Sequence, residues 1–507
     1  MTTGIDYDLC IIGGGINGAG IARDAAGRGL KVLLLEADDF GSGTSSASTK
    51  LIHGGLRYLE NYEFKMVRSA LQERERLLSI APHVIWPMRF VLPHTPEQRP
   101  SWMIRIGLFL YDHLAKREKL PPSGGFDLSR DERGKPLKGK FKKAFHYSDC
   151  WADDSRLVSL NAMSAAQKGA TILTRRKCVK LKHEKEFWLV EHEAASGKAE
   201  REVVKASMVV NAAGPWVQKV LEDSELTDGR SDVPRVRLVK GSHIIVKQRF
   251  KGEHAYIFQQ PDRRIVFAIP YEKDYTLIGT TEEGHEGDAR EAMISDDEMA
   301  YLIEAHNRFF EKSISKKDVI WTYSGVRPLF DEGGDDVTSA TRDYKIHSHL
   351  EYAAPLISVF GGKLTTYRKL AEQVVDQTLH LSNRNAAPWT DTQALPGGDI
   401  PDGDFDAFLA AQGQRYKWLP KAMLYRFARC YGTCMDTFLR DARAIDELGE
   451  AFGGGLYEAE LLYLLRYEFA QTAEDVLWRR TKLGLHVEDD VAAKVEKYIK
   501  AYRKGKV

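Results

Sequence analysis

The chain has 507 residues, and its 73 Lys and Arg residues nearly balance its 72 Asp and Glu residues, leaving a formal net charge of +1. A chain of this length predicts roughly two to four domains, and the balanced charge gives no overall field that would attract nucleic acid, so we expect no nucleic-acid partner. Five cysteines without a CxxC pair, no export signal and no run of ~20 apolar residues predict a cytoplasmic protein without a membrane-spanning helix.

A nucleotide-binding pattern opens the chain. Residues 8–12 predict a buried strand, GGGING follows at 13–18, residues 19–29 have alanines at helical spacing, and residues 31–35 predict a second strand ending at Glu36. In this context GxGxxG indicates a dinucleotide site, because the glycines permit a tight turn and close approach of a pyrophosphate to the helix N-terminus. Glu36 would accept hydrogen bonds from the adenosine ribose. An ordinary βαβ turn without a ligand is the less favoured alternative.

The loop at 37–58 is rich in Gly, Ser and Thr, which suits a segment lying along the pyrophosphate and ribityl chain. Taken alone, its hydroxyl run at 44–46 would more often be a solvated loop. Residues 63–78 then predict an amphipathic helix, and the prolines within 82–100 indicate a departure from the first domain.

Residues 102–111 are aromatic and aliphatic and have basic flanks. This pattern is typical of a helix in the headgroup layer of an anionic membrane, although a buried helix with a solvated end is an equal alternative. The flanking and downstream cations are Arg99, Arg105, Lys116, Arg117, Lys119, Lys138, Lys140, Lys142 and Lys143.

Further elements follow in order. Helices are expected at 155–166 and 295–311, strands at 170–174, 187–190, 206–210 and 356–360, and alternating strands between 236 and 281. The alternating strands predict an antiparallel sheet inserted between parts of the nucleotide domain. After the last strand we expect a helix that starts at Gly362. Residues 388–406 predict a linker, and the chain beyond them is expected to be helical, with Gly453, Gly454 and Gly455 as a helix break.

Three predicted strand ends, after Ile12, Asn211 and Phe360, are followed by glycines and can surround one long cofactor. One dinucleotide site without a separate nicotinamide site favours FAD as the hydride acceptor, and a helix dipole starting at Gly362 would stabilise negative charge on the reduced ring. We expect an α/β fold with a discontinuous FAD-binding domain (1–85, 150–235 and 330–385), a substrate-binding and membrane-docking domain (86–149 and 236–329) and a C-terminal all-α domain (400–507).

Five runs carry a family resemblance: IIGGGINGAG at 11–20, TSSASTKLIHGGLRYLE at 44–60, KGSH at 240–243, WTYSGVRP at 321–328 and FGGKLTTY at 360–367. They resemble the aerobic, FAD-dependent glycerol-3-phosphate dehydrogenases, and YEAE at 457–460 and LWRRTK at 477–482 also fit. The resemblance implies a Rossmann-like fold of the D-amino-acid oxidase and glutathione reductase kind. It also implies oxidation of sn-glycerol 3-phosphate to dihydroxyacetone phosphate, with electrons passing through FAD to a membrane quinone. The protein would bind the inner face of the cell membrane peripherally. Whether it forms a homodimer is left undecided by the resemblance.

Residue roles follow from this chemistry. Arg57 and Arg327 are expected to clamp the phosphate, and His243 and His53 are the two alternatives for the base that takes the hydroxyl proton. An arginine-rich site could instead stabilise the alkoxide, with water as proton acceptor. Tyr58, Lys363 and Thr365 are expected to touch the substrate, Lys363 also in a catalytic role. We expect no metal site. The expected cofactor-binding residues are Gly13, Gly14, Gly15, Asn17, Gly18, Glu36, Thr44, Ser45, Ser46, Ser48, Lys50, Leu51, His53, Gly54, Ala213, Gly214, Trp216, Gly361, Gly362, Lys363, Leu364 and Thr365.

Other functions remain open at this point. An oxidase of the same family would pass electrons to oxygen and release peroxide. A flavin-containing binding protein would show no turnover, and its C-terminal helices would bind a partner. A sugar-acid or amino-acid oxidase is disfavoured by the two predicted phosphate-binding arginines.

Overall fold

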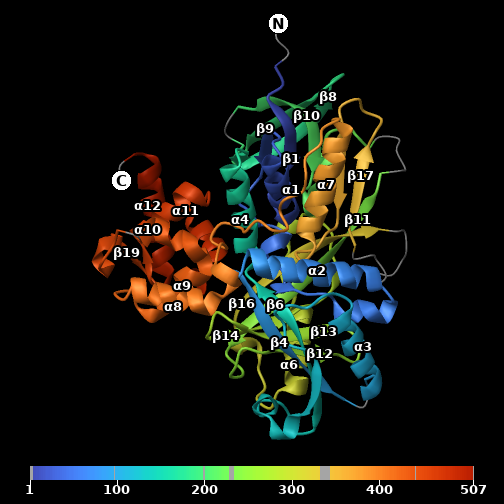
Figure 1. The fold of residues 1–507 in the computed structure, drawn as a ribbon, viewed down its shortest axis with the longest axis vertical. Coiled ribbons are helices and arrows are strands. Elements are labelled where there is room, and N and C mark those ends of the chain that lie inside the picture. The colour runs from blue at the N-terminus through green and yellow to red at the C-terminus, as the bar shows by residue number, and fades with distance from the viewer. Residues whose placement is uncertain are drawn as a thin grey trace.

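The computed structural model describes residues 4–95, 98–197, 200–227, 233–331, 343–439 and 441–505. Figure 1 shows two β-sheet layers stacked along the long axis, with a block of C-terminal helices, coloured orange to red, beside them. The architecture is the expected one: an α/β layer with a parallel sheet, a largely antiparallel second sheet, and a C-terminal helical domain.

The first sheet contains β1 (Tyr7–Ile12), β2 (Val32–Leu35), β7 (Thr171–Leu173), β8 (Arg176–His183), β9 (Trp188–Ala194), β10 (Glu202–Asn211), β17 (Lys345–His349) and β18 (Leu356–Phe360). Its strand order is β17-β18-β10-β1-β2-β7, and the strands from β18 to β7 run parallel. Helices α1 (Ile16–Gly27), α4 (Asp154–Gln167) and α7 (Tyr367–Leu381) pack together beside it. Strand segments covered on both faces must be apolar, which explains the unbroken hydrophobic runs at residues 9–12 of β1 and 32–35 of β2.

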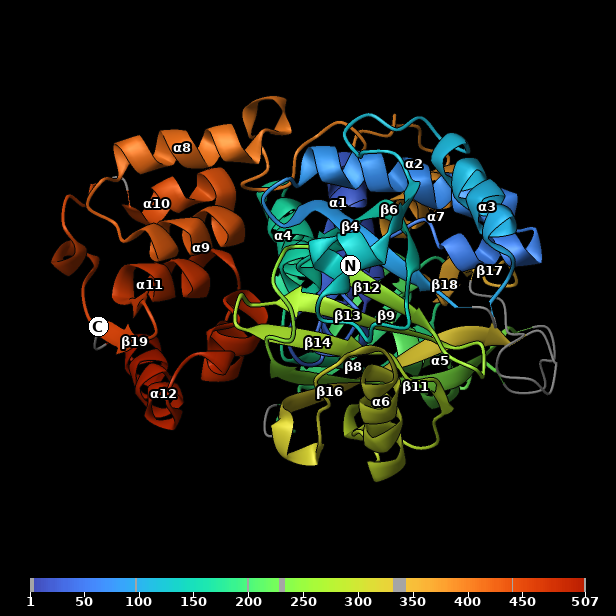
Figure 2. The ribbon, with the colours of Figure 1, turned by 90° about the horizontal axis from the view of Figure 1, so that it is seen from below.

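The second sheet contains β3 (Leu51–Ile52), β4 (Ile85–His94), β5 (Gly124–Asp127), β6 (Lys143–Ala152), β11 (Arg235–Lys247), β12 (Ala255–Gln259), β13 (Ile265–Tyr271), β14 (Tyr275–Gly279), β15 (Glu283–Gly284) and β16 (Val319–Asp331). All of its pairings are antiparallel except that of β4 with β12. Figure 2 shows α2 (Phe64–Ile80) and α6 (Asp296–Phe309) on opposite sides of these strands, with α3 (Ser101–His113) at one edge. The residue ranges predicted for α2 and α6 agree with the structure within about two residues.

The C-terminal domain contains α8 (Phe405–Arg415), α9 (Lys421–Tyr431), α10 (Asp436–Leu439), α11 (Glu458–Tyr467), the single π-helical turn η11 (Asp475–Arg480) and α12 (Asp489–Arg503). Its hydrophobic core is continuous with that of α1 and α4. A buried ion pair between Arg156 of α4 and Glu468 after α11 joins the two parts. Among the described residues, no helix combines the length and apolar character needed to cross a bilayer.

Two local predictions were wrong. The helix expected from Gly362 begins at Tyr367, because Gly361 and Gly362 have φ angles of +79° and +105°, which a right-handed helix excludes. The glycines at 453–455 do not break a helix but form the turn of a hairpin between β19 (Ala451–Gly453) and β20 (Leu456–Tyr457). All three have positive φ angles, so their conformation depends on glycine.

The predicted domain limits stay a prediction. Strand β3, at residues 51–52, pairs with β6, which itself extends to Ala152, so the second sheet takes residues from the first-domain side of both the limit at 85 and the limit at 150.

Candidate functional site

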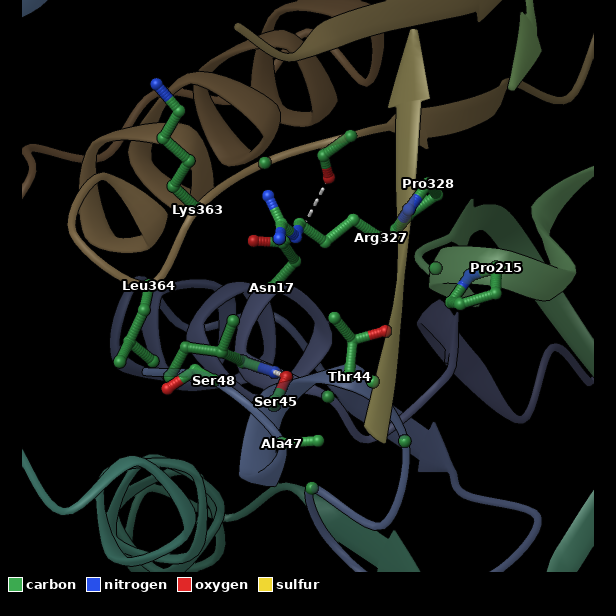
Figure 3. Close-up of a pocket in the computed structure, with 18 of the residues that line it drawn as sticks. Asn17, Thr44, Ser45, Ala47, Ser48, Pro215, Arg327, Pro328, Lys363 and Leu364 are labelled. Atoms are coloured by element: carbon green, nitrogen blue, oxygen red, sulfur yellow. Dashed lines mark hydrogen bonds between the residues drawn. The ribbon is translucent and has the colours of Figure 1, made fainter. Parts of the chain in front are cut away.

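A cleft of about 490 Å³ lies where the first sheet meets the second. Its walls come from the turn between β1 and α1, the loop after β2, the 3₁₀ helix η2 (Leu56–Asn61), the segment after β10, strand β16 and the turn before α7. Figure 3 shows side chains from these segments, including Asn17, Thr44, Ser48, Arg327 and Lys363, around the cleft. The carboxyl ends of β1, β10 and β18 therefore meet at one site, which is where ligands bind in open α/β sheets.

The glycine turn at one end of the cleft permits no side chains. Gly13 has a φ of +103°, and a Cβ there would lie 2.6 Å from the carbonyl oxygen of Ala212. A Cβ on Gly18 would lie 1.8 Å from the carbonyl oxygen of Gly13. Gly15 lines the cleft, so the bare backbone at the start of α1 is open to a ligand.

Glu36 forms part of the wall beside this turn. Its Oε2 accepts a 2.6 Å hydrogen bond from the Gly14 N–H, and its Oε1 accepts one of 2.7 Å from the Asp38 N–H. Burial raises the pKa of the Glu36 carboxyl to about 7, against the lowering effect of these two bonds. Further donors from a ligand would stabilise the ionised form.

Residues 44–50, here called the hydroxyl loop, are held by contacts with residues far away in the sequence. The Ser45 Oγ accepts a hydrogen bond of 3.0 Å from the Ile16 N–H, and the Thr44 Oγ1 donates one of 2.5 Å to the Val326 carbonyl. The Ser48 Oγ donates to Asp154 at 2.8 Å. These bonds fix the loop between α1, α4 and β16.

Cationic side chains gather in the part of the cleft formed by η2, β16 and the turn before α7. Among the described residues, Arg57 has no hydrogen bond or ion pair, and Lys363 has no carboxylate partner. The Lys363 Nζ lies 4.2 Å from the centroid of the Tyr58 ring and 3.3 Å from the Met66 sulfur. Arg327 differs, because its Nη1 lies 3.1 Å from the Glu282 Oε1. Cations without a carboxylate partner beside a cleft are suited to an anionic ligand.

His243 projects from β11 into the cleft and is 2% exposed. Its Nε2 lies 3.0 Å from the Thr49 Oγ1, and its ring stacks on Tyr323 with centroids 4.7 Å apart. Burial lowers the pKa of His243 well below its ordinary value, and the nearby charges of Lys50 and Arg327 lower it further. The imidazole is therefore neutral near pH 7 and can accept a proton, and its Nδ1 has no partner in the described part of the chain.

His53, the alternative base, also lines the cleft. Its backbone N–H donates to the Thr365 Oγ1 at 3.2 Å, which joins the segment before η2 to the turn before α7. The structure thus brings both histidines to the same cleft.

Five predicted cofactor residues do not line the cleft: Gly14, Gly18, Ser46, Lys50 and Gly54. Lys50 has a φ of +60°, and its Nζ contacts Asp154 at 2.8 Å, so its side chain is turned toward α4. With Ser46 it lines a second cavity of about 440 Å³. The remaining predicted residues do line the cleft, and their individual roles stay predictions: Gly13, Gly15, Asn17, Glu36, Thr44, Ser45, Ser48, Leu51, His53, Arg57, Tyr58, Ala213, Gly214, Trp216, His243, Arg327, Gly361, Gly362, Lys363, Leu364 and Thr365.

Other cleft residues were not foreseen. Glu282 forms the ion pair with Arg327, Phe267 supplies an apolar wall, and Arg290 lies over the Trp216 ring at 4.5 Å. None of them lies in a recognisable motif, and only the fold brings them to the cleft. In the described ranges, no group of three or more His, Cys, Asp or Glu side chains could hold a metal ion.

Comparison with known proteins agrees with this geometry. Residues 8–368 match the DAO family of FAD-dependent oxidoreductases, and residues 388–504 match the C-terminal domain of alpha-glycerophosphate oxidase. The chain belongs to the FAD-dependent oxidoreductase family.

Several relatives of this oxidoreductase have names that refer to sugar-alcohol phosphates. D-erythritol 1-phosphate dehydrogenase of Brucella abortus is 50% identical and covers 96% of this chain and 97% of its own. Aerobic glycerol-3-phosphate dehydrogenase of Escherichia coli is 47% identical and covers 98% and 97%. Among solved structures, the glycerol-3-phosphate dehydrogenase of Bacillus halodurans complexed with FAD is similar, with a TM-score of 0.75, 27% identity and coverage of 98% and 94%.

The residues of this FAD-dependent oxidoreductase fit its cofactor. The side-chain-free turn at Gly13 and Gly15 can accept a pyrophosphate, and the Glu36 carboxylate can accept hydrogen bonds from the ribose hydroxyl groups. Asn17 donates through its Nδ2 to the Gly361 carbonyl at 3.1 Å, while its Oδ1 is buried with no partner among the residues described. Because buried acceptors normally receive a hydrogen bond, we expect a bound group to donate one to this oxygen.

Proposed function

We propose that this oxidoreductase oxidises a phosphorylated polyol, with sn-glycerol 3-phosphate as the first choice of substrate and dihydroxyacetone phosphate as its product. The observation that carries the proposal is the pair of cations, Arg57 and Lys363, which lack carboxylate partners among the described residues and line the same cleft as the glycine turn. A dianionic phosphate is the ligand that such a cationic wall is suited to bind. D-Erythritol 1-phosphate is the alternative substrate, because relatives named for each compound have similar identities of 50% and 47%.

The chemistry assigns distinct roles to side chains. FAD, when bound, supplies an acceptor for the hydride that leaves the carbinol carbon. Arg57 and Arg327 hold the phosphate and so orient the chain of the substrate, while Lys363 and Thr365 contact its oxygens. His243 is neutral and removes the proton of the hydroxyl group that becomes the carbonyl, with His53 as the alternative base.

Membrane quinone is the proposed final electron acceptor, and oxygen is the alternative. Support for a membrane location comes from α3, where only Leu108 and Tyr111 are buried. Trp102, Ile106 and Phe109 are 61%, 51% and 60% exposed. An apolar helix face with cations at its ends suits the headgroup layer of the inner face of an anionic membrane.

Anaerobic reduction of the purified holoenzyme tests the substrate proposal. Glycerol 3-phosphate should bleach the visible absorbance of the flavin within seconds, whereas glycerol and NADH should not. D-Erythritol 1-phosphate, measured alongside, decides between the two polyols by its kcat/KM. A flavin that none of these phosphates reduces would overturn the proposal. Stoichiometric peroxide in air, with no response to added quinone, would reverse the choice of acceptor.

A further inference from the structure

Residues 475–482, which comprise the turn η11 and the two residues after it, form a bridge from the C-terminal domain to the cleft of about 490 Å³. We call this cleft the FAD cleft. We infer that Arg480 and Trp478 of this bridge are positioning residues: Arg480 fixes the loop that follows Glu36, and Trp478 fixes the ring of His243. The His243 half of this inference rests on the proposed function. The FAD half does not.

The first contact is made by arginines. Asp39, only 2% exposed, accepts hydrogen bonds from the Arg480 Nη1 and Nη2 at 2.7 and 2.8 Å and from the Arg479 Nε at 2.5 Å. Asp39 directly follows Asp38, which lines the cleft and donates its N–H to Glu36. A buried carboxylate held by two guanidinium groups cannot shift without losing its partners, so the loop beside Glu36 is fixed by the C-terminal domain.

The second contact is a chain of aromatic rings. Trp478 stacks on Trp321 of β16, with centroids 4.4 Å apart and planes at 25°. Trp321 lies 5.7 Å from Tyr323, whose ring stacks on His243. Tyr323 also donates its hydroxyl proton to the Ser48 carbonyl at 2.8 Å. Four rings thus lead from η11 to His243, and a displacement of Trp478 removes the packing surface under Trp321.

The third contact involves Lys482, just beyond η11. Its Nζ contacts the Ser155 Oγ and lies 3.2 Å from the Asp153 Oδ1. Asp154, between these two residues, holds Ser48 and Lys50 of the hydroxyl loop. All three contacts therefore end at segments that form the cleft or hold its loop.

The space between these segments is hollow. The second cavity, of about 440 Å³, is lined by Trp321 and Trp478 and shares Thr44, Ala47 and Gly325 with the FAD cleft. These shared residues form a thin wall between the two spaces, and the bridge supports this wall from the side of the second cavity through the contact of Trp478 with Trp321. Positioning by the bridge follows from this arrangement, because a wall next to a hollow moves more easily than one inside a packed core.

Five variants of the full-length protein test the inference. Arg480→Met removes one of the two guanidinium groups that hold Asp39 and leaves that of Arg479. Trp478→Ala removes the first ring, with Trp478→Phe as the conservative rescue. Gly484→Ala displaces the indole without changing it, because the new Cβ would lie 2.4 Å from the Trp478 Cε2. Glu460→Gln is the matched control, since it breaks a buried ion pair with Arg426 that lies within the C-terminal domain.

Two measurements separate positioning from general destabilisation. Arg480→Met should raise the dissociation constant of FAD for the apoprotein, followed by flavin fluorescence, by about tenfold or more. Trp478→Ala and Gly484→Ala should lower the limiting rate of anaerobic flavin reduction by about tenfold. The substrate dissociation constant should change little, and Trp478→Phe should restore the rate.

Both values should stay near wild type in Glu460→Gln. The inference is overturned if the bridge variants leave both quantities within about twofold of wild type, or if Glu460→Gln changes them equally. Should Trp478→Ala fail to fold, the milder Gly484→Ala decides. An unchanged rate in His243→Asn would contradict the proposed base, while the FAD measurement would still test Arg480.

Discussion

Glu282 lies 3.1 Å from Arg327 in the wall of the FAD cleft, so the guanidinium group expected to bind phosphate already faces a carboxylate. A phosphate and this carboxylate would compete for the same donors. We therefore expect the contact between the two residues to affect the affinity for an anionic substrate.

Glu282→Gln should strengthen substrate binding, because it removes the competing charge but keeps the size of the side chain. We expect KM for glycerol 3-phosphate to fall about threefold to tenfold, and to rise about 10- to 100-fold in Arg327→Ala, by the strength of charge-assisted hydrogen bonds. Glu283→Gln, whose carboxylate instead lies 3.5 Å from Lys240, is the control. If Glu282→Gln raises KM as Arg327→Ala does, Glu282 orients the arginine instead of competing for it.

Arg57→Ala should weaken binding of phosphorylated substrates by about 10- to 100-fold in KM, since no group within the described ranges occupies the native guanidinium, which can make bidentate bonds to phosphate. Turnover of phosphate-free glycerol should remain equally poor. Arg57→Lys should recover only part of the affinity, because an ammonium group cannot reproduce the planar fork. Arg68→Ala, on the exposed face of α2, serves as the control. An equal loss with both substrates would show that Arg57 does not contact phosphate.

His243→Asn should lower the limiting rate of flavin reduction by about 100-fold or more, as expected for loss of a general base. Because burial lowers the pKa of His243 well below its ordinary value, the wild-type imidazole stays neutral as the pH falls from 8 to 6. The reduction rate should then show no loss with an apparent pKa of about 6.5 in that range. Such a loss, abolished in His53→Asn, would assign the base to His53.

Membrane binding should depend on the exposed face of α3. Trp102→Glu combined with Phe109→Glu should abolish flotation of the protein with anionic liposomes, because two charges would enter the headgroup layer in place of rings. Wild-type binding should weaken at high salt. Val203→Glu, at a residue of β10 that is 52% exposed, is the matched control and should float normally. Flotation that survives the double substitution would place the membrane contact elsewhere.

Stability should decrease in mild acid. His83 is fully buried, and burial, together with the charges of Arg156 and Arg429, lowers its pKa to about 3. In the unfolded chain the imidazole of His83 has the ordinary histidine pKa of about 6.5, so the unfolded state binds a proton there more readily than the folded state does. Each pH unit below about 6.5 therefore lowers the free energy of unfolding by up to about 1.4 kcal/mol. Thermal melting at pH 5 and pH 7 measures the effect. His83→Leu should melt with a smaller difference between the two pH values, and an unchanged difference would contradict the assignment.

Local sequence predicted those parts of the site whose constraints are themselves local. The glycine turn and Glu36 fall within one βαβ unit, so spacing alone indicated their arrangement. The orientation of Lys50 was not predictable in this way, because it depends on Asp154, 104 positions away. The start of α7 was misplaced for a related reason, since nothing in the sequence indicates that Gly361 and Gly362 adopt positive φ angles.

Long-range pairings were beyond the sequence patterns. Thr49 and His243 are 194 positions apart, and only the pairing of β11 with β16 and the course of the hydroxyl loop bring them together. The family resemblance placed both residues in family motifs but did not indicate that their side chains are in contact. The LWRRTK segment was recognised as part of the family, yet its contact with Asp39 spans 440 positions and became visible only in the fold.

The strand order of the first sheet also constrains when the protein can mature. Strand β18 borders β10, so the cleft cannot form completely until residue 360 has left the ribosome. Asp39 acquires its arginine partners only after a further stretch of chain is made, because Arg479 is synthesised 440 residues after it. At about 5–20 residues per second, the nascent N-terminal half spends tens of seconds with unpaired strand edges. Flavin capture should therefore follow release of the finished polypeptide. Ribosome-stalled chains that end before residue 475 should bind flavin far more weakly than the completed protein.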